Sequence, residues 1–291
     1  MSCHCGGEPP RPGRSVEIAL IDFHTHSAAS DGVLAPAALV DRAQREGVER
    51  LAITDHDTIA GYLSVCNQQP LELDVISGVE LSCEWGRVGI HVIGLGFDPK
   101  APGLQAHLTR LDAARQERAK RIDQKLERAG MPGAMAGALR EAAGAQIGRP
   151  HFARWMVSAG HVVSEAEAFK RFLGRGKAGD ISVLWPSLPE TVEAILDARG
   201  QPVLAHPAHY GLTATRLREL VDAFTSAGGA AIEIINGRPK PGEQDMLWRL
   251  ANDRGLRVSV GSDFHRDSTY GAGLGVDVTK MPSGCGIWEV V

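Results

Sequence analysis

Imidazole and carboxylate side chains follow short apolar runs at distant points of this 291-residue sequence. The first run, 18–23, leads directly into His24 and His26, and two histidines at positions i and i+2 of a strand point to the same side. Similar runs place nine candidate metal ligands at or beside their ends: His24, His26, Asp31, His56, Glu80, His91, His206, Asp263 and His265. Imidazole and carboxylate donors together suit Mn²⁺, Fe²⁺ or Zn²⁺.

This set of ligands is larger than one ion can use, so the sequence predicts a site for two or three divalent ions. Unrelated core histidines are the alternative, but a buried carboxylate without a partner is costly. In a barrel of parallel strands the carboxyl ends converge on one mouth. Such a barrel would bring these distant side chains together.

Strand-length apolar runs alternate with amphipathic stretches, which is typical of a parallel α/β fold. Helices are expected over 36–46, 187–199, 213–227 and 242–254, and the second begins with an S-x-x-E capping box. The expected strands end near His24, Asp55, Glu80, Gly96, His206, Asn236 and Asp263.

The alternation stops after Asp98 and resumes near Pro186. We therefore expect a disordered tail over 1–16, a metal-binding barrel built from 17–98 and 186–291, and a helical insertion over 99–185 that covers the active site. The insertion carries 15 Lys and Arg against 8 Asp and Glu, so a chain of net charge −4 has −11 elsewhere. This segregation favours an anionic substrate, although cations at helical spacing, such as Arg121, Lys125 and Arg128, are also typical of a solvated helix face.

The composition indicates the general class to which this protein belongs. With 43% apolar and 23% charged residues, the chain resembles an ordinary globular protein. A membrane-length apolar run and a signal peptide are both absent, so we expect a cytoplasmic protein without a membrane partner or an evident stable protein partner. Five irregularly spaced cysteines predict reduced thiols, and Cys3-His4-Cys5 lacks the paired spacing of a zinc site. Neither a Ser-His-Asp arrangement nor a phosphate-cradling glycine loop is evident.

The candidate ligands lie in motifs that resemble those of the PHP (polymerase and histidinol phosphatase) superfamily. In order, the motifs are Asp22-Phe23-His24-Thr25-His26-Ser27, Ser30-Asp31-Gly32, Thr54-Asp55-His56-Asp57-Thr58, Gly78-Val79-Glu80, Leu204-Ala205-His206-Pro207 and Gly261-Ser262-Asp263-Phe264-His265. The resemblance implies a distorted, seven-stranded (β/α) barrel with a trinuclear metal centre. It implies one ion on His24, His26, Glu80 and Asp263, a second on Glu80, His91 and His206, and a third on Asp31, His56 and His265.

Further features resemble one branch of the superfamily, which contains nucleoside 3',5'-bisphosphate phosphatases and related 5'-3' exoribonucleases of the RNase AM type. They are the insertion after the His91 strand, Gly148-Arg149-Pro150-His151-Phe152, and the pair Arg115 and Arg118. By similarity, Arg115, Arg118, Arg149 and His151 would grip substrate phosphate or base. Lys177, in a glycine-rich turn, and His209, which stands where the branch has arginine, are further candidates for substrate contact.

The expected function is metal-dependent hydrolysis of a nucleotide phosphate monoester, the 3'-phosphate of a nucleoside 3',5'-bisphosphate. Metal-activated hydroxide would attack phosphorus, and the arginines would neutralise charge on the phosphoryl group. The catalytic ligands would be Asp31, His56, His206, Asp263 and His265. Short 5'-phosphorylated RNA and a histidinol-phosphate-type substrate are alternatives, and a non-catalytic nucleotide-binding module is another. Asp22, Asp55 and Asp57 are expected to orient imidazoles by accepting their second N–H, and Asp57 could equally cap the helix that follows it.

Overall fold

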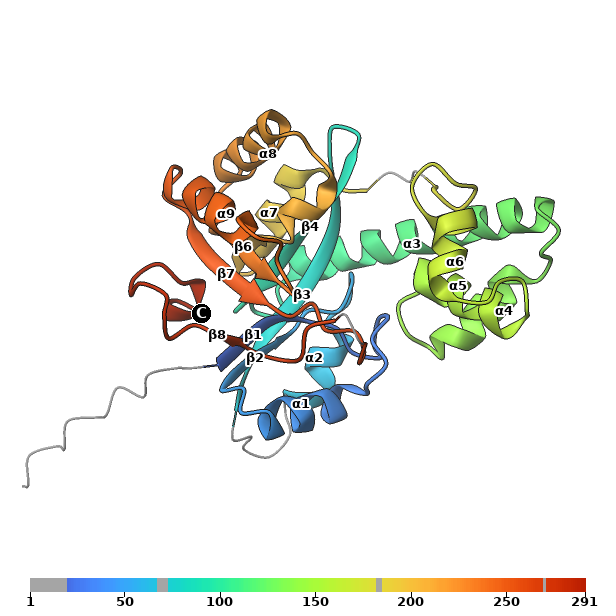
Figure 1. The fold of residues 1–291 in the computed structure, drawn as a ribbon, viewed down its shortest axis with the longest axis horizontal. Coiled ribbons are helices and arrows are strands. Elements are labelled where there is room, and N and C mark those ends of the chain that lie inside the picture. Colours follow the sequence, from blue (N-terminus) through green and yellow to red (C-terminus); the bar gives the residue numbers. More distant parts are fainter. Residues whose placement is uncertain (1–19, 67–72, 182–184, 269–270) are drawn as a thin grey trace, which may run out of the picture.

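The computed structural model describes residues 20–66, 73–181, 185–268 and 271–291, so the expected tail lies outside the described residues. Within this part, the strands form one sheet in the order β7-β6-β5-β4-β3-β2-β1-β8 (Figure 1). They are β1 (Leu20–Thr25), β2 (Arg50–Ile53), β3 (Asp74–Trp85), β4 (Val88–Leu95), β5 (Gln201–Leu204), β6 (Ala231–Asn236), β7 (Arg257–Gly261) and β8 (Val276–Asp277). The first seven are the strands that the sequence predicts, and β8 adds a short antiparallel edge to β1.

The sheet curls until β1 and β7 meet, which makes a nearly closed barrel. The amide of Asp263 donates to the carbonyl of His24 at 2.8 Å, and that of His26 donates to the carbonyl of Phe264 at 2.9 Å. A Cβ at Gly261 would lie 2.6 Å from the backbone nitrogen of His24, so this close approach requires glycine. The closure brings the polar residues after both strands to the same mouth, as expected of an α/β barrel.

Strands β3 and β4 form an antiparallel hairpin, which departs from the expected barrel of parallel strands. β3 continues past Glu80 to Trp85, and β4 runs antiparallel to both β3 and β5. Only Gly86, at a φ of 62°, and Arg87 separate the paired residues Trp85 and Val88. A two-residue turn closes a hairpin, whereas a parallel connection needs a crossover of about a dozen residues. The prediction that a strand ends near Glu80 is therefore wrong.

Helices cover the outside of the barrel much as the sequence predicts. α1 (Pro36–Arg45) and the short, unpredicted α2 (Ala60–Val65) lie beside β1 and β2, and α7 (Leu188–Asp197), α8 (Ala214–Ser226) and α9 (Glu243–Asn252) lie beside β4 to β7 (Figure 1). The predicted capping box is present: the Ser187 amide donates to Glu190 at 2.8 Å, and the Glu190 amide donates back to the Ser187 hydroxyl. None of the helices in the described part combines the length and the apolarity that crossing a bilayer requires.

The expected insertion is helical. It contains α3 (Pro102–Arg128), α4 (Ala134–Ala142), α5 (Arg149–Ser158), α6 (Glu165–Ala168) and the π-helical turn η1 (Phe169–Leu173). The first half of α3 packs Leu104 and Leu111 into the barrel core. Its second half packs Leu126 into a separate core with Phe152 and Met156. Because 27 residues of helix span about 40 Å, α3 is a rigid link between the two cores, and the division at 99–185 stays a prediction.

Candidate metal centre

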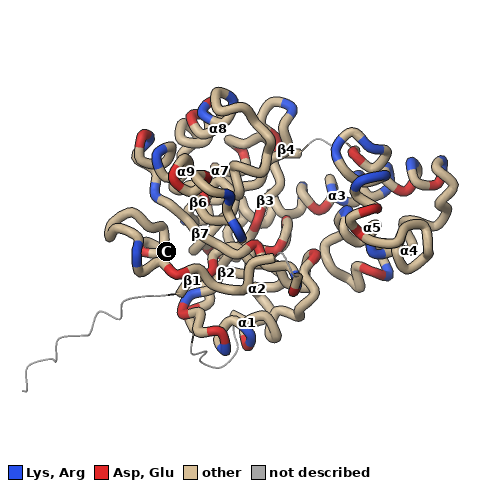
Figure 2. The backbone as a smooth tube through the Cα atoms, viewed as in Figure 1, with Lys and Arg blue, Asp and Glu red and all other residues tan. Residues whose placement is uncertain are grey.

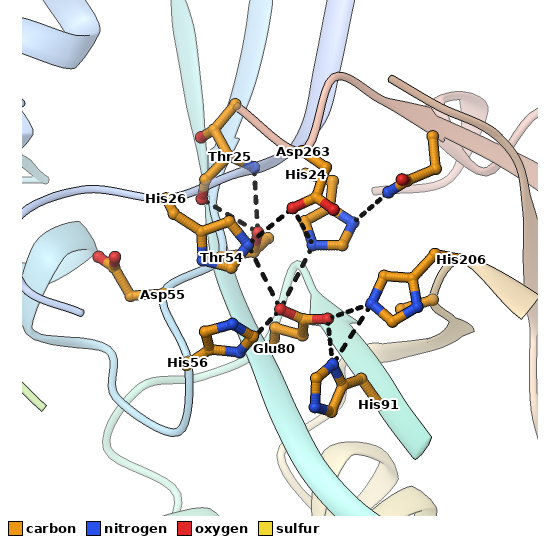
Figure 3. Close-up of polar contacts among 12 residues, drawn as sticks. His24, Thr25, His26, Thr54, Asp55, His56, Glu80, His91, His206 and Asp263 are labelled. Atoms are coloured by element: carbon orange, nitrogen blue, oxygen red, sulfur yellow. Dashed lines mark hydrogen bonds and ion pairs between the residues drawn. The ribbon is translucent and has the colours of Figure 1, made fainter. Parts of the chain in front are cut away.

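Glu80 lies at the middle of the predicted ligands, with its side chain 1% exposed (Figure 3). One carboxylate oxygen, Oε1, is 2.7 Å from His91 Nδ1 and 2.8 Å from His206 Nε2. The other, Oε2, is 2.9 Å from His56 Nδ1 and 3.3 Å from His26 Nε2. One carboxylate thus faces imidazoles on both of its oxygens, which is the arrangement that a bridging ligand requires.

The remaining ligands form groups on either side of Glu80. Asp263 Oδ1 lies 3.2 Å from His26 Nε2 and 3.5 Å from His24 Nε2. Asp31 lies 3.3 Å from His265 Nε2. All nine predicted ligands fall into overlapping sets whose donor atoms lie within 4.8 Å of one another: His26, Asp31, His56 and His265; His24, Glu80 and His206; His24, His26 and Asp263; and His56, Glu80 and His91. The structure therefore brings together every residue that the sequence singled out as a ligand.

Several ligand atoms in this cluster are buried and, although some lie close to one another, make no hydrogen bond in the described part of the chain. They are His24 Nε2, both ring nitrogens of His26, His56 Nδ1, His206 Nδ1 and Glu80 Oε2. Buried polar atoms are normally paired, because leaving them unpaired costs free energy. Nitrogen and oxygen donors at this spacing fit divalent metal ions, so the cluster could hold a metal.

The electrostatics of the cluster differ from one ligand to the next. Burial lowers the pKa of His24, His56, His206 and His265, but neighbouring carboxylates more than offset this effect and raise it, so these rings would release protons on binding metal. Burial raises the pKa of Glu80, but the imidazoles of His91, His56 and His24 together hold it well below its usual range. Burial, together with the nearby His265, lowers the pKa of His26 to about 3. The carboxylate is therefore ionised and the His26 imidazole neutral at pH 7, as coordination requires.

Unusual backbone conformations aim two of the candidate ligands. His206 follows β5 with a φ of 28°, and Asp263 follows β7 with a φ of 53°. Left-handed conformations of non-glycine residues cost about 1–3 kcal/mol and are concentrated at functional sites. The His206 amide is held by Glu233 Oε2 at 2.6 Å, and the Asp263 amide by the carbonyl of His24, so the surrounding structure fixes both turns.

Glu233 and Asn236, on β6, support the cluster and were not predicted. The Glu233 side chain is 1% exposed, and its Oε1 accepts from His24 Nδ1 at 2.9 Å. Asn236 Nδ2 donates to Glu233 Oε2 at 3.2 Å. With Nδ1 engaged, His24 presents Nε2 to the cluster, which fixes its tautomer. An acidic residue inside the apolar run 231–235 was the signal that could have identified Glu233.

Among the described residues no imidazole donates to Asp22, Asp55 or Asp57, so the role predicted for them is wrong. Asp57 does not cap α2 (Ala60–Val65) either. Asp22 accepts from the amides of Ser262 and Gly275, both at 2.9 Å. Asp55 lies apart from the cluster in Figure 3 and accepts from the hydroxyls of Ser27 and Ser30, both at 2.6 Å, while Asp57 accepts from the Ser82 amide at 2.6 Å. The turns that carry the ligands leave amide and hydroxyl donors unpaired, and these carboxylates satisfy them. The three residues therefore fix loops, and Asp22 also accepts from the backbone amide of His24 at 3.3 Å.

A basic pocket of about 410 Å³ lies beside the cluster, and we call it the inner pocket. Three predicted substrate residues, Arg118, Arg149 and His209, line it together with Arg87, Arg175 and Trp185. The ring of His209 stacks on the ring of His206 at 5.7 Å, which places the pocket next to a candidate ligand. Its lining has the charge expected of a phosphate-binding site.

The other predicted substrate residues do not line the inner pocket. Arg115 is buried and its Nε donates to Asp57 at 2.5 Å, so this guanidinium ties α3 to the loop after β2. His151 is 1% exposed, and its Nδ1 accepts from the Gly148 amide at 3.0 Å, as part of the N-terminal cap of α5. Lys177 lines a different pocket. Substrate contacts by these three residues stay predictions.

Comparison with known proteins gives matches over nearly the whole chain. Residues 22–129 match the PHP domain family. The chain is 40% identical to a 5'-3' exoribonuclease from Haemophilus influenzae, over 92% of this chain and 97% of that protein. It is 37% identical to a 3',5'-nucleoside bisphosphate phosphatase from Chromobacterium violaceum, over 94% of this chain and 96% of that protein.

Solved structures share the fold. An amidohydrolase from Chromobacterium violaceum, with bound sulfate and no metal, superimposes with a TM-score of 0.82 at 35% identity, over 92% of this chain and 94% of that one. A protein assigned as a metal-dependent phosphoesterase from Bifidobacterium adolescentis gives a TM-score of 0.79 at 29% identity, over 89% of this chain and 93% of that one. Coverage this complete includes the helical insertion as well as the barrel.

Proposed function

The chain belongs to the PHP family and is a metal-dependent phosphoric ester hydrolase, and from that premise we propose that it removes the 3'-phosphate of nucleoside 3',5'-bisphosphates. The observation that carries the proposal is the inner pocket beside the ligand cluster, since a substrate with two phosphates needs two anion-binding environments. A 37% identical relative is named for this activity, which supports the same substrate class.

Glu80, His24, His26 and Asp263 would hold one ion, and Glu80, His91 and His206 would hold another. Asp31, His56 and His265 would hold a third. Bound Mn²⁺, Fe²⁺ or Zn²⁺ would supply Lewis acidity and lower the pKa of water towards neutrality. The chain's own part is to keep Glu80 ionised and His26 neutral at the donor atoms that face the cluster. The other histidines with a raised pKa, among them His24 and His206, would give up a proton when metal binds.

Arg118 and Arg149 would bind the phosphate that is not hydrolysed. Burial, together with the neighbouring cations Arg149 and Arg115, lowers the pKa of Arg118 to about 9, so these cations repel one another. A phosphate dianion would relieve that repulsion and would accept paired hydrogen bonds from the planar guanidinium groups. His209, exposed beside His206, is the group placed to donate a proton to the leaving oxygen.

A second candidate is 5'-3' exonucleolytic cleavage of short RNA, which the 40% identical relative favours. The same cluster and inner pocket would serve both reactions, because each hydrolyses a phosphate ester next to another phosphate. Shortening of an oligonucleotide one residue at a time would establish this activity.

The test is phosphate release by the Mn²⁺-loaded protein from a nucleoside 3',5'-bisphosphate, a nucleoside 3'-monophosphate and histidinol phosphate. We expect kcat/KM for the bisphosphate to exceed that for the monophosphate by about 10- to 100-fold, the value of one or two charge-assisted hydrogen bonds. Arg118→Met and Arg149→Met should each reduce that preference and leave bound metal unchanged, whereas Arg140→Met, an exposed position on α4, should have no effect. Equal turnover of the bisphosphate and the monophosphate by the unmodified protein would overturn the proposal.

A further inference from the structure

A second basic hollow, of about 450 Å³, adjoins the inner pocket, and we call it the outer pocket. Its cations are Arg121, Lys125, Arg128 and Lys177. Asp180 and Ile181 line both pockets, so the two hollows share a wall. From the metal cluster outwards, the order is therefore ligand cluster, inner pocket, outer pocket.

The outer pocket is assembled from two separate segments of like charge. Arg118, Arg121, Lys125 and Arg128 follow one another at i, i+3, i+7 and i+10 and so share one face of α3. Lys177 reaches the same hollow from the segment after η1. Figure 2 shows Lys and Arg gathered on the insertion around α3, while acidic residues gather near β3 at the centre of the barrel.

Carboxylates neutralise only part of this charge. Arg121 pairs with Glu117 at 2.7 Å, and the carboxylate of Asp180 accepts from the Gly176 amide at 2.7 Å. For Lys125, Arg128 and Lys177, no carboxylate lies within ion-pair distance in the part of the chain that the structure describes. A merely solvated helix face would carry its cations on one element, whereas here α3 and the segment after η1 both contribute cations to one hollow. Their mutual repulsion costs free energy, and an anion bound between them would relieve it.

We propose that the outer pocket binds a further phosphate of a single-stranded nucleic acid whose scissile phosphate lies at the ligand cluster and whose next phosphate lies in the inner pocket. The inference rests on the proposed function, because it extends the same line of anion sites. From Arg118 to Lys125, α3 advances about 10 Å, so a nucleoside bisphosphate held in the inner pocket would not also fill the outer one. The substrate class that uses all three sites is a short oligonucleotide.

The experiment compares the Mn²⁺-loaded protein with Lys125→Ala/Arg128→Ala/Lys177→Ala. A matched control, Lys120→Ala/Arg140→Ala/Lys170→Ala, removes the same charge from exposed positions that line neither pocket. Substrates are a nucleoside 3',5'-bisphosphate, a 3'-phosphorylated RNA pentamer and a 5'-phosphorylated RNA pentamer. The two pentamers extend to opposite sides of the scissile phosphate. Affinity for each pentamer, made with phosphorothioate linkages to slow cleavage, is measured across a range of salt concentrations.

We expect the pocket variant to lose about tenfold or more in kcat/KM and in affinity for the 3'-phosphorylated pentamer, because its chain continues beyond the phosphate in the inner pocket. We expect no change for the bisphosphate. The variant's binding should also depend less on salt, by about 0.7 in slope for each phosphate contact removed. The control should match the unmodified protein. An equal loss for the bisphosphate and both pentamers, or no loss for the 3'-phosphorylated pentamer, would overturn the inference. The proposed function would fail separately if the unmodified protein did not release phosphate from the bisphosphate. In that case the binding measurement would still test the outer pocket.

Discussion

Glu233 contacts none of the proposed metal ions, yet it determines which nitrogen His24 presents to them. Its Oε1 accepts from His24 Nδ1 at 2.9 Å, and its other oxygen holds the His206 amide at 2.6 Å. Carboxylates that orient a histidine ligand in this way typically contribute 10- to 100-fold to metal affinity. Two candidate ligands therefore depend on one buried side chain outside the cluster.

We expect Glu233→Gln to weaken metal binding by about 10- to 100-fold, since the amide can still accept a hydrogen bond but lacks the charge that makes the imidazole a better donor to metal. Competition with a chelator of known affinity measures the effect. Glu219→Gln, on the exposed part of α8, is the control and should bind metal normally. Unchanged metal affinity in the Glu233 variant would show that His24 does not need this partner.

His151 is the residue whose titration should be visible in stability. Burial, together with the nearby Arg154, lowers its pKa to about 4, so the folded chain keeps the imidazole neutral with Nδ1 accepting from the Gly148 amide. The unfolded chain, with a pKa near 6.5, binds a proton more readily as the pH falls towards 4. The part of the unfolding free energy that depends on a neutral His151 is therefore complete above about pH 6.5 and is lost as the pH falls from there towards 4.

His151→Gln should make unfolding less sensitive to acid. Glutamine is a usual residue at this position of a capping box, so it can keep the cap and does not titrate. Between pH 7 and pH 5 we expect the variant to lose about 2 kcal/mol less unfolding free energy than the unmodified protein, as measured by urea denaturation. A parallel loss in both proteins would mean that His151 is not the group that titrates.

At the scale of elements, the sequence predicts what depends on local pattern. The capping box at Ser187 and the strands that lead into His24 and Asp263 follow from spacing and hydrophobicity. The direction of β4 does not, because it depends on the two-residue turn at Gly86-Arg87 and on pairing with β5, 106 or more residues further along the chain. Glu233 was missed for a similar reason, since its partners lie on other strands and only the fold brings them together.

Arg115 shows how an element can be anchored by a residue with a different predicted role. Its buried guanidinium pairs with Asp57 and reaches the Ser82 hydroxyl at 3.3 Å, so it fixes α3 against the barrel. The pKa of Asp57 is raised by burial, but Arg115 more than offsets this effect together with the Ser82 amide. The pair therefore keeps a charged carboxylate inside the protein.

Arg115→Met should lower the unfolding free energy by about 3–5 kcal/mol, because it leaves the buried Asp57 carboxylate without a partner. Adding Asp57→Asn should restore part of that loss, so the double variant should be more stable than the sum of the single effects predicts. Arg110→Met, which breaks the exposed pair with Glu190, should cost no more than about 1 kcal/mol. If the double variant loses the sum of the unfolding free energies lost by the single variants, the two residues do not form a stabilising ion pair. An altered KM for Arg115→Met without a change in stability would favour substrate contact by Arg115.

At the scale of the whole molecule, the cores differ in their relation to the ligand cluster. The strands that carry or lead into candidate ligands, among them β1, β3 and β7, contribute Phe23, Val79 and Val260 to the barrel core. The insertion core, around Leu126, Phe152 and Met156, contains none of the nine candidate ligands. Loss of metal should therefore destabilise the barrel more than the insertion.

Chelation should lower the unfolding temperature by about 8–16 °C. A ligand present at a thousand times its Kd stabilises a protein by about 4 kcal/mol, and each kcal/mol shifts the Tm of a large domain by about 2–4 °C.

Hydrogen exchange should show which part of the protein the metal stabilises. Amides near His24 and Asp263 should exchange faster after chelation. The ligand atoms Glu80 Oε2 and His26 Nε2, which make no hydrogen bond, would then lie 3.3 Å apart without a cation between them. Amides of α4 and α5 should be unchanged, and Mn²⁺ should reverse both effects. Equal acceleration in the barrel and the insertion, or an unchanged Tm, would mean that the cluster does not couple metal binding to the folding of the barrel.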